Sequence, residues 1–365
     1  MTRIAYLSLH WPRPLESGVG KKIYQQISLW RDAGNEVRFF MHTHPYSNSQ
    51  KMIEGNYYQY WSGDGVLGFL RTESSRSAAL REMIRDVAEY RPNIIYLRWG
   101  MYVLPLGRLS RIAPLVVEIN TNDVLQHLGL GKIYYYYNLL TRSIILRSAV
   151  GFVSVSQELA QNHQFKKYHK PTIVIGNGYD LTGIQPLHAP QNNAPRLVFL
   201  GSPDNIWHGV DKLVPFARSF PDIRVDIIGY DRIIGQDELP GNLHLHGYLQ
   251  SEGYMDLLRS ADAAFGSLAL HRIGLNEAST LKTRESLAYG LPLILAYRDT
   301  DLDELDCEFL LKIPNREDNL ITYGKAVHDF AFRIRGVRVD RQLIDPRIDA
   351  RIKEQERLDF LKQFV

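Results

Sequence analysis

Short runs of β-branched and aromatic residues alternate with stretches of helical periodicity along the whole chain. In the helical stretches apolar residues recur on one face, as Ile23, Ile27 and Trp30 do in the first of them. Buried strands are predicted at 4–7, 37–40, 94–97, 115–117 and 152–155, and again at 197–200, 225–228, 243–246, 263–265 and 293–295. Because strands alternate with helices of this length, the pattern predicts an α/β fold of parallel sheets covered by helices on both faces.

The two halves of the chain open alike. Residues 3–7 and 196–200 are each followed by a loop, a glycine-containing turn at 18–22 or 209–212, and a helix. A chain of 365 residues is long enough for two domains of ordinary size. We therefore predict two doubly wound, Rossmann-like domains. Ligands of such sheets bind beyond the carboxyl ends of the strands, so we expect the two domains to face a shared cleft.

Local composition places the domain boundaries. Residues 182–195 contain three prolines and the polar run 191–193, which is typical of a linker. We place the N-terminal domain at 1–181 and the C-terminal domain at 196–340. The remaining residues, 341–365, combine charges with apolar positions and predict a surface helix packed on the body of the protein. A return of this helix to the N-terminal domain is the alternative.

The overall composition excludes several classes of protein. Hydrophobic residues make up 45% of the chain, which is too apolar for a disordered protein. Lys and Arg number 43 and Asp and Glu 40, and a net charge of +3 does not indicate a nucleic-acid partner. The single cysteine, Cys307, excludes an intrachain disulfide and a thiolate zinc site. The apolar run at 4–9 is too short for a secretory signal, and we expect a cytoplasmic protein.

The segment 277–292 combines a predicted helix with charged side chains. Ser279 or Thr280 predicts the start of a helix at 281–289, and Gly290 predicts its end. The charged residues of the segment are Glu277, Lys282 and Glu285.

These charges suit an activated sugar. Lys282 and Glu285 are three residues apart and share one face of the helix, while Glu277 lies in the preceding loop. Carboxylates accept hydrogen bonds from sugar hydroxyls, and a lysine beside a helix N-terminus suits a diphosphate. The alternative is a solvated surface helix with an ordinary Glu–Lys pair.

The segment resembles part of a known family. The segment from Glu277 to Glu285 has a glutamate at each end and seven residues between them. Together with residues 286–292, it resembles the E-x7-E region of retaining GT-B glycosyltransferases, glycosyltransferase family 4 (group 1) in particular. The resemblance extends from residue 3 to residue 300. Further segments match the family in the same order along the chain: 17–20, 29–37, 91–96, 153–159, 175–180, 199–202 and 207–213.

The resemblance implies an activity and a setting. It implies a metal-independent hexosyltransferase that retains the anomeric configuration and moves a sugar from a nucleoside-diphosphate donor to a hydroxyl acceptor. The implied acceptor is a glycan or a lipid-linked molecule, and no cofactor besides the donor is implied. The implied setting is bacterial cell-envelope or exopolysaccharide assembly at the inner face of the plasma membrane, with peripheral membrane contact.

The resemblance also implies roles for individual residues. By matched position, Glu285 holds the ribose hydroxyls and Glu277 lies near the donor sugar. The loop at Gly18 and Gly20 approaches the phosphates or the acceptor, although an ordinary tight turn is the alternative for it. The positions whose backbone amides face the diphosphate are Thr280, Leu281 and Lys282.

Some positions depart from the family pattern. Ser202 and His208 stand where many members carry Arg and Lys to neutralise the diphosphate. We expect Lys282 to substitute, helped by His208 when it is protonated. The strand-end histidine of the family has no equivalent, and Asn120 or Asn122 is expected to take its role. The candidate catalytic residues are Glu277, Lys282 and Asn120.

Two alternative functions remain open, and two segments have alternative interpretations. A sugar-nucleotide 2-epimerase of the same fold and an inactive nucleotide- or glycan-binding relative are the alternative functions. Asp299-Thr300-Asp301 matches a metal-binding D-x-D signature, but a solvated acidic loop is favoured and no metal is expected. Residues 132–142 are basic and aromatic, so a lipid interface is one interpretation. The resemblance favours an ordinary core helix there.

Overall fold

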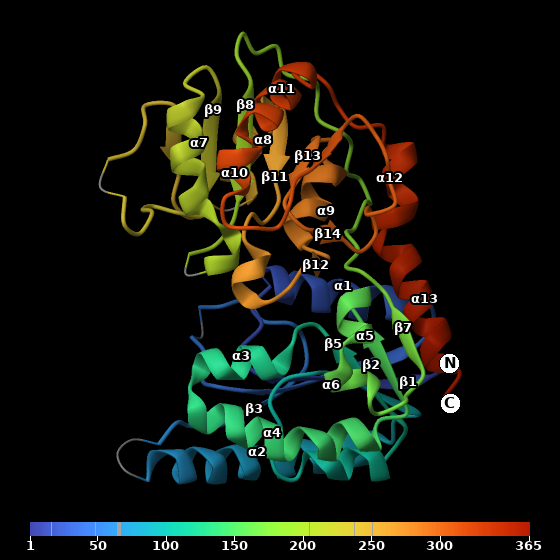
Figure 1. Cartoon of the computed structure of the whole chain (residues 1–365). Coiled ribbons are helices and arrows are strands. Elements are labelled where there is room, and N and C mark those ends of the chain that lie inside the picture. The colour runs from blue at the N-terminus through green and yellow to red at the C-terminus, as the bar shows by residue number, and fades with distance from the viewer. Residues whose placement is uncertain (16, 48, 64–66, 204, 237, 250) are drawn as a thin grey trace. The chain divides into compact units, whose positions relative to one another are not determined.

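The computed structural model of the chain consists of two compact units, each built around its own parallel sheet (Figure 1). Unit 1 comprises Met1–Gly176 and Ala350–Val365, and unit 2 comprises Asn177–Asp349. The structure describes residues 1–15, 17–47, 49–63, 67–203, 205–236, 238–249 and 251–365. The predicted α/β architecture with two parallel sheets is confirmed.

The sheet of unit 1 has seven parallel strands in the order β3-β2-β1-β4-β5-β6-β7. The strands are β1 (Arg3–His10), β2 (Glu36–Thr43), β3 (Asn56–Gln59), β4 (Ile94–Arg98), β5 (Leu115–Ile119), β6 (Gly151–Ser154) and β7 (Thr172–Val174). The order changes direction at β1, since β2 lies on one side of it and β4 on the other. Doubly wound sheets place their ligands at such a point, beyond the carboxyl ends of the strands.

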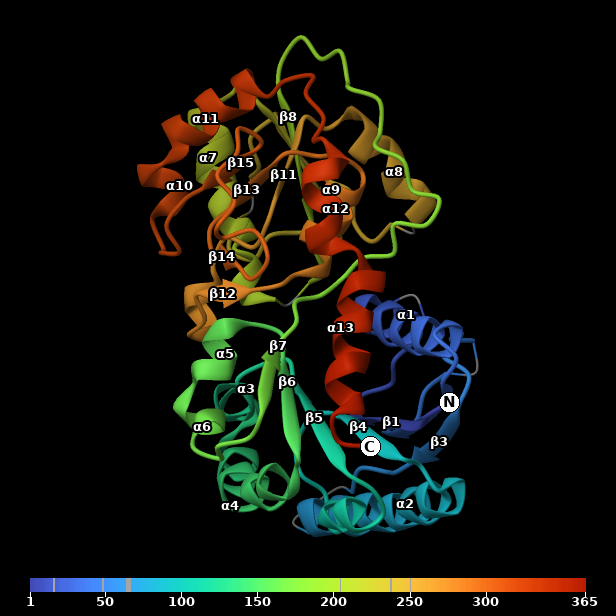
Figure 2. The ribbon, with the colours of Figure 1, turned by 90° about the vertical axis from the view of Figure 1, so that its right-hand side faces the viewer.

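Helices cover both faces of this sheet. Helices α1 and α13 lie side by side on one face, while α2 and α4 cover the opposite face (Figure 2). The predicted helical face of Ile23, Ile27 and Trp30 is fully buried in α1. The α-helices of unit 1 are α1 (Gly18–Asp32), α2 (Gly68–Tyr90), α3 (Asp123–Leu130), α4 (Lys132–Ser148), α5 (Gln157–Gln161), α6 (His163–Lys166) and α13 (Ala350–Lys362).

The main sheet of unit 2 has six parallel strands in the order β10-β9-β8-β11-β13-β15, and β12 pairs with β14 in a separate two-stranded sheet. The strands are β8 (Arg196–Leu200), β9 (Arg224–Ile228), β10 (Leu243–Leu245), β11 (Ala263–Phe265), β12 (Glu277–Ala278), β13 (Leu293–Leu295), β14 (Arg298–Asp299) and β15 (Leu310–Lys312). The α-helices of this unit are α7 (Leu213–Ser219), α8 (Ser251–Ser260), α9 (Leu281–Ala288), α10 (Asn319–Thr322), α11 (Gly324–Arg333) and α12 (Arg341–Ile348). Each predicted strand of the second half is present.

The end of the chain differs from the prediction of a single helix at 341–365. The backbone at Asp349 turns extended, with a ψ of 120°, and this separates α12 from α13. Helix α12 belongs to unit 2, whereas α13 belongs to unit 1 and packs beside α1. The expected linker, 182–195, belongs to unit 2, where the amide of Leu187 donates to the carbonyl of Tyr289 (3.0 Å).

Candidate functional site

Helix α9 of unit 2 begins where the sequence predicts it, but the side chain of the preceding residue, Thr280, does not cap it. Thr280 occupies the N-cap position, yet its side chain makes no hydrogen bond to the helix amides. Its hydroxyl instead contacts the hydroxyls of Thr283 and Tyr297, the latter at 3.1 Å. Leu281 follows at the helix start and is partly exposed. The Thr280 side chain therefore does not occupy the amides at this end of α9, and the positive end of a helix favours an anion.

Glu285 is held by two phenols. Its Oε1 accepts hydrogen bonds from the hydroxyls of Tyr254 (2.6 Å) and Tyr179 (3.2 Å), and the side chain is partly exposed. Burial, and then the charge of Glu285, raises the pKa of Tyr179 well above its ordinary value. Both phenols therefore donate, so that the carboxylate is positioned as an acceptor. Neither tyrosine was predicted, because nothing in the sequence pattern connects residues this far apart with Glu285.

Lys282 lies on the same helix but does not pair with Glu285. Its Nζ is buried, lies 4.3 Å from the centre of the Phe199 ring and has no hydrogen-bond partner among the described residues. Burial lowers the pKa of Lys282 to about 7. The alternative of an ordinary surface Glu–Lys pair is therefore wrong. A buried amine without a partner is costly, and an anionic ligand would supply the missing interaction.

His208 lies next to Lys282 and is neutral. The side chain is buried, and its Nδ1 shares a 2.7 Å hydrogen bond with the hydroxyl of Tyr230. Burial, and then the charge of Lys282, lowers the pKa of His208 to about 2. The expectation that protonated His208 helps to neutralise a diphosphate is therefore wrong, because two cations so close together in a buried place repel each other.

Ser202 follows β8 at the same edge of the sheet. It is exposed, and its hydroxyl accepts a 2.8 Å hydrogen bond from the side chain of Asn205. The preceding Gly201 allows the strand end to pack closely, since a Cβ there would lie 2.6 Å from the Phe199 ring and 2.9 Å from Nδ1 of His208. The structure thus brings Ser202, His208 and Lys282 together at the carboxyl end of β8.

Glu277 lies in β12, apart from the main sheet. Its side chain is buried, and one of its oxygens lies 4.0 Å from Nη2 of the exposed Arg298 on β14. Strand β12 therefore anchors Glu277 four residues before the start of α9. Its predicted place near the donor sugar stays a prediction.

Arg284, which the sequence analysis did not single out, organises the opposite face of α9. It is fully buried and donates to Asp299 (2.6 Å), to Asp301, and to the hydroxyl of Ser279 (2.8 Å). The predicted solvated acidic loop at 299–301 is wrong, because this guanidinium holds both carboxylates inside the protein. Among the described residues, no group of three or more His, Cys, Asp or Glu is placed to hold a metal ion.

The glycine loop of unit 1 leads into α1. The hydroxyl of Ser17 accepts a 3.0 Å hydrogen bond from the amide of Gly20. A Cβ at Gly20 would lie 2.0 Å from the carbonyl oxygen of Pro14, so that only glycine fits there. Gly18 is the first residue of α1 and is exposed. Tight packing accounts for Gly20, and the proposed approach of a phosphate to Gly18 stays a prediction.

Asn120 belongs to a charged cluster at the carboxyl end of β5. Its Oδ1 accepts from Lys22 (3.1 Å) and Arg98 (2.9 Å), and its Nδ2 donates to Glu118 (3.0 Å). Asn122 instead caps α3. Between these two asparagines, the structure therefore places Asn120 among charges and gives Asn122 a structural role.

Glu118 lies at the centre of that cluster, fully buried, 2.9 Å from Lys22 and 3.0 Å from Arg98. Burial alone would raise the pKa of Glu118, but these cations and Arg357 hold it well below its ordinary value. Arg357 and its partner Glu354 come from α13. These charges lie on four separate elements, so the sequence pattern does not connect them.

Comparison with known proteins defines the fold. No family model matches the chain, and no curated protein matches it. Solved structures do match over the whole chain. Sucrose-phosphate synthase from Thermosynechococcus elongatus is 14% identical, with a TM-score of 0.67 over 100% of this chain and 99% of the other. The lipopolysaccharide outer core galactosyltransferase WaaB is 15% identical, with a TM-score of 0.66 over 99% of both chains.

A third match was solved with a ligand. Anabaena Alr3699/HepE in complex with UDP-glucose is 14% identical, with a TM-score of 0.63 over 100% of both chains. A putative UDP-N-acetylglucosamine 2-epimerase from Listeria monocytogenes is 12% identical, with a TM-score of 0.53 over 99% of this chain and 96% of that one. The chain therefore has the GT-B fold, which occurs in more than one class of enzyme.

Proposed function

We propose that the protein transfers a sugar from a nucleoside-diphosphate donor to a hydroxyl acceptor, and that unit 2 binds the donor. The observation that carries this proposal is the buried Nζ of Lys282, which has no hydrogen-bond partner among the described residues and lies on a helix, α9, whose start has no side-chain cap. A diphosphate supplies the negative charge that such a place lacks. Glu285, held by two phenols on the same helix, accepts hydrogen bonds from the ribose hydroxyls.

The chemistry follows from where charge develops. As the glycosidic bond breaks, the leaving diphosphate gains negative charge, which Lys282 and the first amides of α9 stabilise. Thr280, Leu281, Ser202 and neutral His208 contribute hydrogen-bonding groups around the phosphates. The acceptor oxygen bonds to the anomeric carbon on the face that the diphosphate leaves, and its proton passes to the leaving phosphate oxygen. Because the new bond forms on the same face as the broken one, the product keeps the anomeric configuration of the donor.

The acceptor side is proposed for unit 1. Asn120 presents an amide whose orientation is set by Lys22, Arg98 and Glu118. Gly18 begins α1, the helix that carries Lys22. We propose a glycan or lipid-linked hydroxyl as the acceptor, with Glu277 beside the transferred hexose. The proposed setting is assembly of the cell envelope or of an exopolysaccharide at the cytoplasmic face of the membrane, without a required metal.

Nucleotide binding tests the donor site directly. We expect Glu285→Ala to weaken binding of the preferred nucleoside diphosphate by about 1.5–3 kcal/mol, the range for losing a hydrogen bond to a charged group. Calorimetry with a panel of nucleoside diphosphates measures the effect and identifies the base. Glu304→Ala, which removes an exposed carboxylate of unit 2, is the matched control and leaves affinity unchanged. Equal affinities for both variants and the parent protein would refute the role of Glu285.

Protonation of Lys282 gives the binding a defined pH dependence. Because the pKa of Lys282 is lowered to about 7, the amine is mostly neutral at pH 8 without ligand. A bound diphosphate favours the ammonium, so we expect uptake of about one proton per nucleotide at pH 8. Affinity then falls as the pH rises above 7. Calorimetry in buffers of different ionisation enthalpy measures the uptake, which Lys282→Met abolishes; the same uptake in both proteins would contradict the assignment.

The alternative functions give other outcomes in the same assays. A 2-epimerase converts the sugar nucleotide into its free epimer when no acceptor is present. An inactive relative binds the nucleotide and turns over no sugar nucleotide with any acceptor. Transfer to an acceptor without release of a free epimer supports the proposed function.

A further inference from the structure

Helix α4 of unit 1 buries two polar side chains as well as two apolar ones, and it has an apolar side that faces outward. Asn138 and Arg142 are buried against the unit, and Arg142 makes a bidentate ion pair with Asp123, with both contacts at 2.7 Å. The outward side chains are spaced by three, four and four residues, which puts them on one helical face. They are Ile133 (54% exposed), Tyr136 (60%), Leu140 (79%) and Ile144 (46%). An outward face of this kind marks an interaction surface.

The prediction of an ordinary core helix at 132–142 is therefore only half right. The inward face packs through Ile145 and Leu146, but the four outward side chains, which we call the α4 stripe, remain between 46% and 79% exposed. Buried Arg142 takes a place in the interior that an apolar residue would ordinarily fill. No described helix is long and apolar enough to cross a bilayer.

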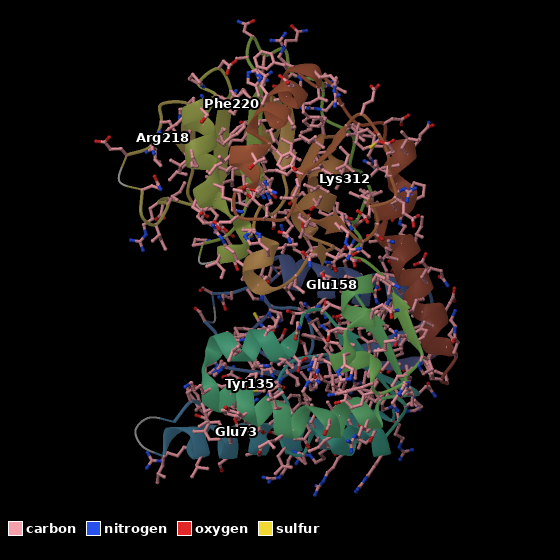
Figure 3. All side chains as sticks on the ribbon, viewed as in Figure 1. Glu73, Tyr135, Glu158, Arg218, Phe220 and Lys312 are labelled. Carbon is pink, nitrogen blue, oxygen red and sulfur yellow. The ribbon has the colours of Figure 1, made fainter. Side chains whose placement is uncertain are left out.

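The surroundings of the α4 stripe are basic. No Asp or Glu occurs between residues 124 and 157, whereas Lys132 and Arg147 lie exposed at the two ends of α4. Two acidic side chains do lie against this helix, and arginines neutralise both. Asp123 pairs with Arg142, and Glu73 on α2 pairs with Arg76; Tyr135 on α4 and Glu73 are marked in Figure 3.

A pocket of about 260 Å³ opens beside the stripe, between α4 and the segment that contains α6. Arg147 and Lys167 supply positive charge to it, and Ser143 and Tyr168 supply hydroxyls. Arg147 has no ion-pair partner among the described residues, and Nζ of Lys167 donates to Oε1 of Gln164 at 3.3 Å. Two cations with hydroxyl donors suit a phosphate group. The full lining is Leu139, Arg142, Ser143, Arg147, Gln164, Lys167 and Tyr168.

We propose that the α4 stripe and this pocket dock unit 1 on an anionic membrane. The stripe enters the interface, where tyrosine rings and aliphatic side chains are stable, and a lipid phosphate occupies the pocket. Basic side chains around an apolar helix face are attracted to anionic lipid. A second copy of the chain fits less well, because a two-fold contact through this face would bring Lys132 and Arg147 of both copies together.

This inference goes beyond sugar transfer, since every residue involved belongs to unit 1 and the donor-binding residues belong to unit 2. Flotation of the full chain with vesicles tests it. We expect binding to vesicles of phosphatidylcholine with phosphatidylglycerol, little binding to phosphatidylcholine alone, and weakening by salt. Leu140→Glu, and Arg147→Glu combined with Lys167→Glu, each lower the bound fraction about tenfold or more.

Matched controls use the same substitutions in unit 2. Ile321, which is 76% exposed, and exposed Arg333 give Ile321→Glu and Arg333→Glu, which leave flotation unchanged. Unchanged melting temperature and nucleotide affinity show that each α4 variant is folded, and they separate this proposal from the proposed function. Three results overturn it: equal flotation of all variants, equal binding to both kinds of vesicle, or lipid-free self-association that Leu140→Glu abolishes.

Discussion

Replacing Lys282 with alanine should lower the turnover number by about 10²- to 10³-fold, the range for losing one group that stabilises transition-state charge. The reason is the place of its Nζ, which is buried, lies over the Phe199 ring and has no hydrogen-bond partner in the part of the chain that the structure describes. The interaction of this amine with the leaving diphosphate is strongest when the diphosphate has acquired its full charge. We therefore expect the turnover number to fall more than the affinity for the donor. Release of nucleoside diphosphate from the bound sugar nucleotide, followed over a range of donor concentrations, measures both.

Two further variants separate charge from packing at this position. Lys282→Met keeps the contact with Phe199 and loses the charge, so it should behave like the alanine variant. Lys282→Arg keeps a charge and should restore part of the turnover. An increase in the Michaelis constant with an unchanged turnover number would show that Lys282 binds ground state and transition state equally, and would contradict its catalytic role.

Replacing Arg284 with methionine should lower the free energy of unfolding of unit 2 by about 3–5 kcal/mol, because it leaves buried charges without their partner. Arg284 and Asp299 are both buried. The guanidinium of Arg284 also pairs with Asp301 and donates a hydrogen bond to the hydroxyl of Ser279. Amide hydrogen exchange in α9, which carries Arg284, and in β13, which contacts α9, measures the loss in unit 2 itself. Exchange in β5 of unit 1 provides the internal reference.

The matched control for Arg284 is another arginine of unit 2 with a single exposed partner. Arg259 on α8 pairs with Asp256 at 2.6 Å, and both side chains are exposed. Arg259→Met should change exchange protection in β13 by the equivalent of about 1 kcal/mol or less, as surface ion pairs do. Similar effects of the two substitutions would mean that the Arg284 cluster is not what stabilises this region.

Local signals account for what the sequence predicted well. Each predicted strand and the helix at 281–289 depend on apolar periodicity and end signals within a few neighbouring residues. Gly290 illustrates this, because its φ of 80° ends α9 as the pattern indicates. The prediction of a solvated acidic loop at 299–301 failed because its side chains pair with a residue outside the loop. Asp299 and Asp301 appear in the sequence as part of an acidic run. In the structure both carboxylates pair with the buried Arg284, which lies fifteen residues before Asp299.

Two protonation states also could not be predicted from the sequence. Lys282 and His208 are 74 residues apart. Burial lowers the pKa of both, and the charge of Lys282 lowers that of His208 further. Burial cannot be inferred from the residue type, since lysine and histidine are usually exposed or paired. The neutral state of His208 and the lowered pKa of Lys282 therefore follow from the packing.

The amino-acid sequence by itself determined the alternation of strands and helices, the doubling of the α/β pattern and the spacing of Glu277, Lys282 and Glu285. These are properties of neighbouring residues and of helix and strand periods. Only the tertiary structure decided which charges are paired and which are left open, and which face of α4 meets solvent. The physical reason is that the free energy of a charge or an apolar side chain depends on everything packed around it, and most of those groups come from distant parts of the chain.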